Sequence, residues 1–217
     1  MLSIEIGNCM KKLVVSFFLI LFGASNLLAQ TIITKEEYAV YASVLSVIYK
    51  DNRQTYSNKS HFVILNVTKV DAELDLTSSK RYKALFGDFK TRNVTPGVIE
   101  TRFPLGAYSE TYYLVPPAQI DELFEKGLAE FDKRYEVEKL IKGLLNPGGS
   151  TWKPFYEKYP EANGYYSLSR VGFNGLLATV QVKREDVNSG FSRAYVLKKI
   201  KGEWKIVDLI SASEWIS

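Results

Sequence analysis

The C-terminal third of the chain carries two strand-like runs that are joined by only two residues. These runs are RAYVLKKI (193–200) and EWKIVDLI (203–210), with Lys201-Gly202 between them. A two-residue connection with glycine at its second position is typical of a tight β-hairpin, because such turns need positive φ angles that glycine adopts without strain. The pattern therefore predicts an antiparallel strand pair.

Two further strands are predicted immediately before this hairpin. Between residues 176 and 183 the apolar residues Leu176, Ala178, Val180 and Val182 alternate with a second, more polar set, which indicates a strand with one buried face. The run at 165–173 precedes it. Together the four runs predict an antiparallel meander whose apolar face needs a cover.

A helix near the N-terminus is the first candidate for that cover. In TKEEYAVYASVLSVIYKDN (34–52), Thr34 and Glu37 form a capping box, in which each side chain satisfies a free backbone N–H of the first turn. Apolar residues then recur at helical spacing and form one stripe: Tyr38, Tyr41, Val44, Leu45 and Ile48. The stripe predicts packing against a core rather than a ligand wall.

The middle of the chain alternates between strand and helix signals. Strands are predicted at 61–68, 98–103 and 111–115. A helix at 78–89, behind a serine cap, has Tyr82, Leu85, Phe86 and Phe89 on one face. Another helix begins at Pro116-Pro117 and carries Ile120, Leu123, Phe124 and Leu128. The predicted fold class is α+β, an antiparallel β-meander at the C-terminal end packed against N-terminal and central helices.

The first 29 residues resemble a signal peptide. Lys11 and Lys12 precede the apolar run Leu13 to Phe22, which is too short for the ~20 residues that a membrane span requires. Cleavage after Ala29 is expected, with Ser25 as an alternative, and Met10 is an alternative start. Residues 30–217 are then predicted to form a single domain with a charged helical insertion near 128–150.

Composition excludes several classes of function. The single cysteine, Cys9, lies in the leader, so the mature chain has no disulfide and no thiolate chemistry. The chain has 28 basic and 24 acidic residues, of which the leader holds two and one, so a net charge of +3 remains. Such an interspersed, mild charge argues against nucleic-acid binding.

Metal and cofactor motifs are also lacking in the sequence. His61 is the only histidine, and a lone histidine at the start of a strand favours a structural role. The acidic run VDAELD (70–75) has neither the central glycine nor the terminal glutamate of a calcium-binding EF-hand loop. No phosphate-binding or dinucleotide-binding motif is found, so neither a metal nor a cofactor is expected.

Arg170 and Asp208 are candidate binding residues because each places a charge among apolar residues. Asp208 shares a predicted strand face with Trp204, Ile206 and Ile210, and a buried carboxylate needs a partner. In a flat meander, however, the first and fourth strands lie about 14 Å apart, and the two side chains reach roughly 10 Å. The favoured alternative is a bulge at Gly172 that leaves Arg170 at the rim.

Aromatic residues concentrate between positions 150 and 169. Trp152, Tyr156 and Tyr159 in this stretch are further candidate binding residues, since rings with polar tips suit sugar stacking or a protein interface. They suit equally well a segment pinned onto the end of the sheet. The pinned segment is the favoured interpretation.

Several motifs together resemble a family of secreted bacterial proteins of unknown function. They are FYEKYP (155–160), LSRVGFN (168–174), GEWKIV (202–207) and the terminal WIS, and the N-terminal EEYAVYASVL is also similar. The resemblance implies export by a bacterium but no reaction. Many members of that family carry a cysteine- and glycine-rich loop where this chain has DVNSGFS (186–192), so a metal or redox role of that loop is not expected here.

The sequence therefore predicts a periplasmic or secreted protein that acts as a non-enzymatic binding module, with a glycan or protein of the envelope as its partner. No catalytic residue is assigned. Two alternatives stay open: a hydrolase acting on envelope material through carboxylates such as Asp208, and a protein that keeps its leader as an N-terminal membrane anchor.

We expect the exported protein to begin at Gln30, or at Asn26 if cleavage follows Ser25. N-terminal sequencing of protein purified from the exported fraction of a bacterial host checks this. A product that retains Lys11 would contradict cleavage and support the anchored alternative.

Overall fold

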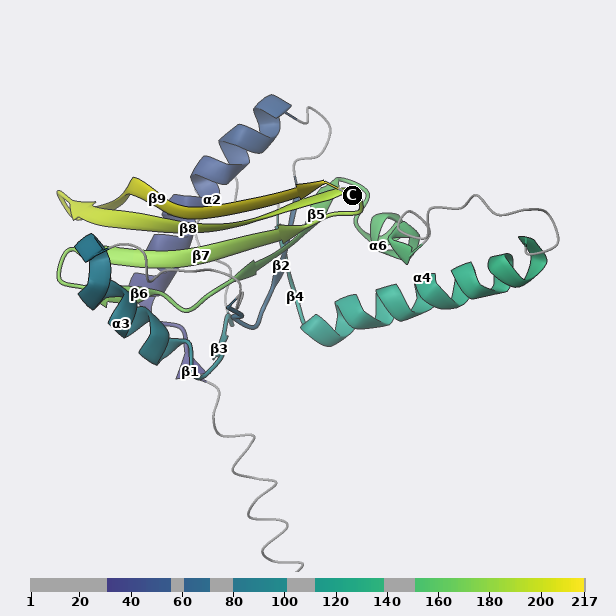
Figure 1. Cartoon of the computed structure of the whole chain (residues 1–217), viewed down its shortest axis with the longest axis horizontal. Coiled ribbons are helices and arrows are strands. Elements are labelled where there is room, and N and C mark those ends of the chain that lie inside the picture. The colour runs from purple at the N-terminus through teal and green to yellow at the C-terminus, as the bar shows by residue number, and fades with distance from the viewer. Residues whose placement is uncertain (1–30, 56–60, 71–79, 101–111, 139–150, 217) are drawn as a thin grey trace, which may run out of the picture. The chain divides into compact units, whose positions relative to one another are not determined.

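A seven-stranded mixed sheet lies at the centre of the fold (Figure 1). The computed structural model describes residues 31–55, 61–70, 80–100, 112–138 and 151–216, and the sheet belongs to the compact unit from Ile32 to Ser217. Its strand order is β4 (Tyr112–Val115), β2 (His61–Leu65), β5 (Ala162–Leu168), β7 (Leu177–Glu185), β8 (Ser189–Ile200) and β9 (Glu203–Ile216), and β6 (Gly172–Asn174) pairs with the first residues of β7.

The C-terminal strands form the predicted meander. All pairs from β5 to β9 are antiparallel, whereas β2 runs parallel to both β4 and β5. The hairpin turn is confirmed, since Lys201 and Gly202 both have positive φ, 52° and 87°. The α+β prediction is therefore correct, and β2 and β4 extend the meander into a mixed sheet.

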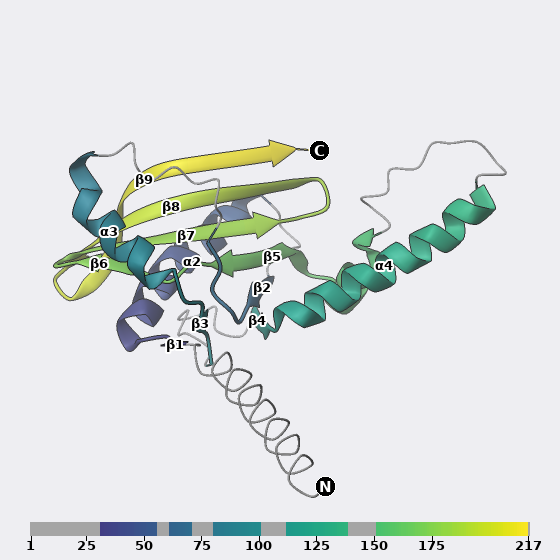
Figure 2. The same cartoon turned by 60° about the horizontal axis from the view of Figure 1, so that its bottom comes forward.

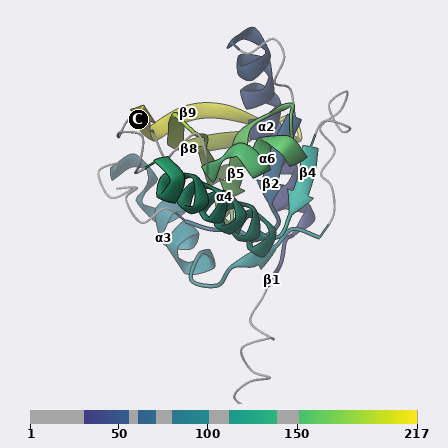
Figure 3. The same cartoon turned by 90° about the vertical axis from the view of Figure 1, so that its right-hand side faces the viewer.

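Helices cover both faces of the sheet. Helix α2 (Lys35–Thr55) lies across one face (Figures 1 and 2). The other face carries α3 (Lys83–Arg92) with the preceding 3₁₀ turn η1 (Lys80–Tyr82) and, nearer β4, α4 (Pro117–Glu138) and α6 (Lys153–Lys158) (Figure 3). The core is thus divided into one large cluster under α2 and two smaller ones on the opposite face.

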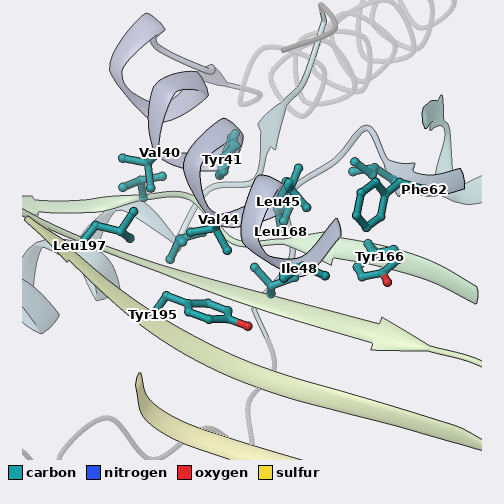
Figure 4. Close-up of a cluster of buried hydrophobic side chains, with 14 of the residues drawn as sticks. Val40, Tyr41, Val44, Leu45, Ile48, Phe62, Tyr166, Leu168, Tyr195 and Leu197 are labelled. Atoms are coloured by element: carbon teal, nitrogen blue, oxygen red, sulfur yellow. The ribbon is translucent and has the colours of Figure 1, made fainter. Parts of the chain in front are cut away.

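The large cluster contains the stripe predicted for the N-terminal helix. Tyr41, Val44 and Leu45 are fully buried, and Ile48 nearly so. Figure 4 shows these side chains of α2 pointing into the sheet, where they meet residues from three strands, β2, β5 and β8: Phe62, Tyr166, Leu168, Tyr195 and Leu197. The capping box is also confirmed, because Thr34 N–H donates to Glu37 and Glu37 N–H donates to Thr34 Oγ1.

Strand β7 is buried on both faces, which differs from the prediction of one buried face. Ala178, Val180 and Val182 face α2 as expected. Thr179 and Gln181 on the opposite face are buried as well. The physical reason is that helix α3 packs on that face, and no local sequence pattern reveals a second cover.

The strand predicted at 165–173 is broken into β5 and β6. Leu168 pairs with Val182, and Gly172 pairs with Thr179. The four steps from Leu168 to Gly172 therefore lie opposite only three steps on β7. One extra residue is therefore inserted, as in a bulge, and Val171 is buried in the cluster under α2.

Side chains form hydrogen bonds with the backbone at this break between β5 and β6. Asn93 accepts from Arg170 N–H (2.8 Å) and donates to its carbonyl (3.0 Å). Glu37 accepts from Val171 N–H and Asp88 from Phe173 N–H. Because Glu37 belongs to α2 and the other two to the α3 region, the break is the point where helices from both faces are attached.

The prediction that Arg170 lies at the rim is wrong. Arg170 is only 4% exposed, and its Nε lies 2.7 Å from Oε1 of Glu37, which is completely buried. A second bond runs from Nη2 to Oε2 (3.1 Å). The bulge turns the arginine inward toward the first turn of α2, and the capping residue supplies the partner that a buried charge needs.

Asp208 does not share a face with Trp204 and Ile206, contrary to the prediction. Val196 pairs with Asp208 and Leu197 with Ile206, so Val207 is an extra residue that reverses the faces of β9. Trp204 and Ile206 pack under α2. Asp208 instead accepts a hydrogen bond from Tyr82 Oη (3.0 Å) on the α3 side.

Other boundaries differ in detail. Helix α3 begins at Lys83 with Tyr82 as its N-cap and without a side-chain cap, so the predicted serine cap is not used. Tyr82, Leu85, Phe86 and Phe89 are buried as expected, whereas Leu128 on α4 is exposed. Of the strand predicted at 98–103, the structure describes residues 98–100, and within these Val98 belongs to a strand, β3 (Gly97–Val98), which pairs with β1 (Thr31–Ile32).

Two predictions fall outside the part of the chain that the structure describes. They are the signal peptide at 1–29 and most of the insertion near 128–150, of which α4 covers the first residues. Within the described ranges, no helix is both long and apolar enough to cross a membrane.

Replacing Arg170 by Met is expected to destabilise the protein by about 3–5 kcal/mol, because it leaves Glu37 buried and unpaired. Urea unfolding of residues 30–217 measures this. The double variant Glu37→Leu/Arg170→Met removes both charges and should lose less than the sum of the two single variants. As a control, Lys153→Ala at an exposed ion pair should change stability by less than about 0.5 kcal/mol. A similar small effect of Arg170→Met would contradict the pairing.

The stability that Glu37 contributes should disappear in acid. Burial alone would raise the pKa of Glu37, but hydrogen bonds from Arg170, Thr34 and Val171 lower it below its ordinary value of 4.5. A lowered pKa means that the contribution is complete above this value and is lost as the pH falls through the folded-state pKa. The difference in unfolding free energy between wild type and Glu37→Gln should therefore be constant above about pH 5.5 and narrow below about pH 4. A difference that stays constant to low pH would contradict this.

Candidate functional site

The five residues singled out from the sequence do not form one site. Arg170 is committed to Glu37 under α2. Asp208 binds Tyr82 on the opposite face of the sheet. Trp152, Tyr156 and Tyr159 lie with α6 near the β4 side. The structure thus separates the charged candidates from the aromatic ones.

The aromatic stretch is packed onto the sheet. Trp152 stacks against Tyr156 and Tyr165, each with 5.8 Å between ring centroids, and meets the edge of Phe124 at 4.8 Å. Tyr156 Oη also donates to Asp186. Burial and this hydrogen bond raise the pKa of Tyr156. The ring of Trp152 is therefore engaged by its neighbours, as expected for a pinned segment.

A pocket of about 470 Å³ lies beside this cluster, between α4 and the sheet. Its size is within the range of small-molecule sites, ~300–1,000 Å³. The apolar part of the wall comes from the end of β2, the chain that follows it and the start of α4: Leu65, Val67, Val70, Pro117 and Ile120. The polar part is formed by Lys69, Asp121, Tyr165, Ser167, Lys183 and Glu185.

Strand register builds the polar floor of the pocket. Ser167 on β5 pairs with Lys183 on β7, which pairs with Ser192 on β8. Cross-strand neighbours lie ~5 Å apart with side chains on the same face. Lys69 follows β2, and its backbone N–H donates to Leu168 O (2.8 Å), which places it on the other side of Ser167. Ser167 is therefore flanked by two lysines.

Of the two lysines in the pocket, Lys183 forms an ion pair and Lys69 does not, within the part of the chain that the structure describes. Lys183 Nζ lies 3.0 Å from Oε1 of Glu185, and Oε2 of Glu185 accepts from Tyr165 Oη (2.7 Å). Burial and this hydrogen bond raise the pKa of Tyr165, which keeps it a donor. Among the described residues Lys69 Nζ has no ion-pair partner. Asp121, on α4, supplies the remaining charge of the wall.

The arrangement suits an acidic group better than a metal ion. Two lysines and a serine that line the same pocket supply positive charge and hydrogen-bond donors for an anion. Within the described ranges no group of three or more His, Cys, Asp or Glu side chains is placed to bind a metal.

Sequence reasoning missed Lys69, Ser167 and Lys183. Lys183 was recognised only as part of the polar face of its strand. Its neighbours in the pocket depend on the register between β5 and β7 and on the parallel pairing of β2, a strand from early in the chain, with β5. The single usable signal was the position of Lys183 on the face opposite the apolar set Ala178, Val180 and Val182.

A comparison of the chain with protein-family models, curated proteins and solved structures gives no match in any of the three.

Proposed function

We propose that the protein is an exported, non-enzymatic binding module whose pocket between α4 and the sheet takes a small amphipathic anion. The observation that carries the proposal is that Lys69, Ser167 and Lys183 line one pocket together with apolar side chains from the end of β2 and the start of α4. The resemblance to secreted proteins and the leader-like N-terminus support the exported location.

Each part of the pocket has a role in this proposal. The acidic group, a carboxylate or a phosphate, lies at Ser167 and receives hydrogen bonds from the two lysines. The apolar body lies against Leu65, Val67 and Ile120. Glu185 does not compete for Lys69, because its two carboxylate oxygens already contact Lys183 and Tyr165.

Isothermal titration of residues 30–217 with octanoate, octyl phosphate and octanol tests the proposal. We expect saturable binding of at least one of the two anions and weaker binding of the neutral alcohol. Lys69→Met and Lys183→Met should each weaken anion binding about tenfold, the usual value of a hydrogen bond to a charged group.

Lys205→Met is the matched control, because Lys205 is an exposed lysine of β9 outside the pocket. It should leave the affinity unchanged. Equal binding of octanoate, octyl phosphate and octanol, or equal losses in all three lysine variants, would refute the anion site.

A further inference from the structure

A second pocket, of about 230 Å³, lies where β2, β4 and the start of β5 meet the end of α6. It is lined by His61, Tyr113, Tyr159, Pro160, Glu161 and Ala162. It shares no lining residue with the larger pocket. Its chemistry is therefore independent of that pocket.

Glu161 contacts the histidine through both its backbone and its side chain. The backbone N–H of His61 donates to Glu161 O (3.1 Å), and Nδ1 of the ring lies 2.6 Å from Oε2 of the Glu161 carboxylate. Nδ1 is buried and the carboxylate oxygen lies out of line with its N–H bond, so the contact is electrostatic rather than a well-aligned hydrogen bond. A carboxylate oxygen at this distance favours the tautomer with the proton on Nδ1, in which Nε2 is the acceptor.

The Nε2 atom is accessible. Nδ1 of His61 is among the buried polar atoms that lack a hydrogen bond, and Nε2 is not. No hydrogen bond of Nε2 is found among the described residues. Since the side chain of Glu161 is 58% exposed, its carboxylate is accessible too. The pocket thus presents two acceptors, one of them charged.

Aromatic rings form the rest of the wall. The ring of Tyr113 is on the edge strand β4, is 43% exposed, and lies 5.9 Å from His61 and 5.2 Å from Tyr159 between centroids. The faces of such rings carry negative potential and attract cations. Lys158 shows this attraction within the chain, because its Nζ lies 5.8 Å from the centroid of Tyr159.

All these features favour the same ligand charge. The geometry points to a site for a small primary ammonium group, which donates hydrogen bonds to Glu161 and to His61 Nε2 while its alkyl chain lies on the face of Tyr113. A neutral alcohol would lack the charge. A quaternary ammonium would lack the N–H donors.

Ligand-observed NMR and calorimetric titration of residues 30–217 test the site. The probes are n-butylammonium, 1-butanol and tetramethylammonium. We expect saturable binding of n-butylammonium, and at least tenfold weaker binding of 1-butanol, since a hydrogen bond to a charged group is worth about tenfold or more. Tetramethylammonium should fall between the two.

Three variants distinguish the parts of the site. Glu161→Gln should weaken n-butylammonium binding about tenfold or more, and Tyr113→Leu about two- to thirtyfold. His61→Phe keeps a ring but removes Nε2, and should weaken binding of n-butylammonium without changing that of tetramethylammonium.

Glu157→Gln is the matched control, because Glu157 is an equally exposed carboxylate, 56% exposed, that pairs with Lys153 on α6 outside the pocket. It should leave binding unchanged. The site is refuted if n-butylammonium does not saturate, if 1-butanol binds equally well, or if Glu161→Gln and Glu157→Gln have the same effect. Because both carboxylates are exposed, circular dichroism is expected to show both variants folded.

Discussion

The buried contact between Glu37 and Arg170 organises the rest of the fold. Glu37 is both the capping residue of α2 and the acceptor for Arg170 and for Val171 N–H. One carboxylate therefore starts a helix, neutralises a buried charge and satisfies the backbone of a broken strand. The large core under α2 depends on this contact, since the contact sets where the helix begins and how it lies on the sheet.

Local patterns predicted most elements of the fold. The turn at Lys201-Gly202, the capping box at Thr34 and the start of a helix after Pro116 depend on residues a few positions apart, and the structure has all three. A bulge was also predicted, at Gly172, and the extra residue lies just before it, between Leu168 and Gly172. The direction in which Arg170 points was not predicted, because its partner Glu37 lies 133 residues away in the sequence.

The sites were less predictable for the same reason. Asp208 was placed on the wrong face because Val207 reverses the strand, and nothing in the sequence EWKIVDLI marks that extra residue. The floor of the larger pocket needs the register of β5 with β7. The smaller pocket needs the parallel pairing of β2 with β4 and β5. Of the aromatic candidates, Tyr159 does line a pocket, whereas Trp152 and Tyr156 pack among their neighbours.

The close approach of α3 to β6 affects how the protein unfolds. A β-carbon on Gly172 would lie 2.6 Å from the backbone of Phe89, so the helix rests directly on the strand. Two residues earlier in the chain, Arg170 ties the same segment to α2. Neither helix can leave the sheet without disturbing the anchor of the other. The two layers should consequently be lost in one cooperative step, and amide protons of this segment should exchange with solvent only through global opening of the structure.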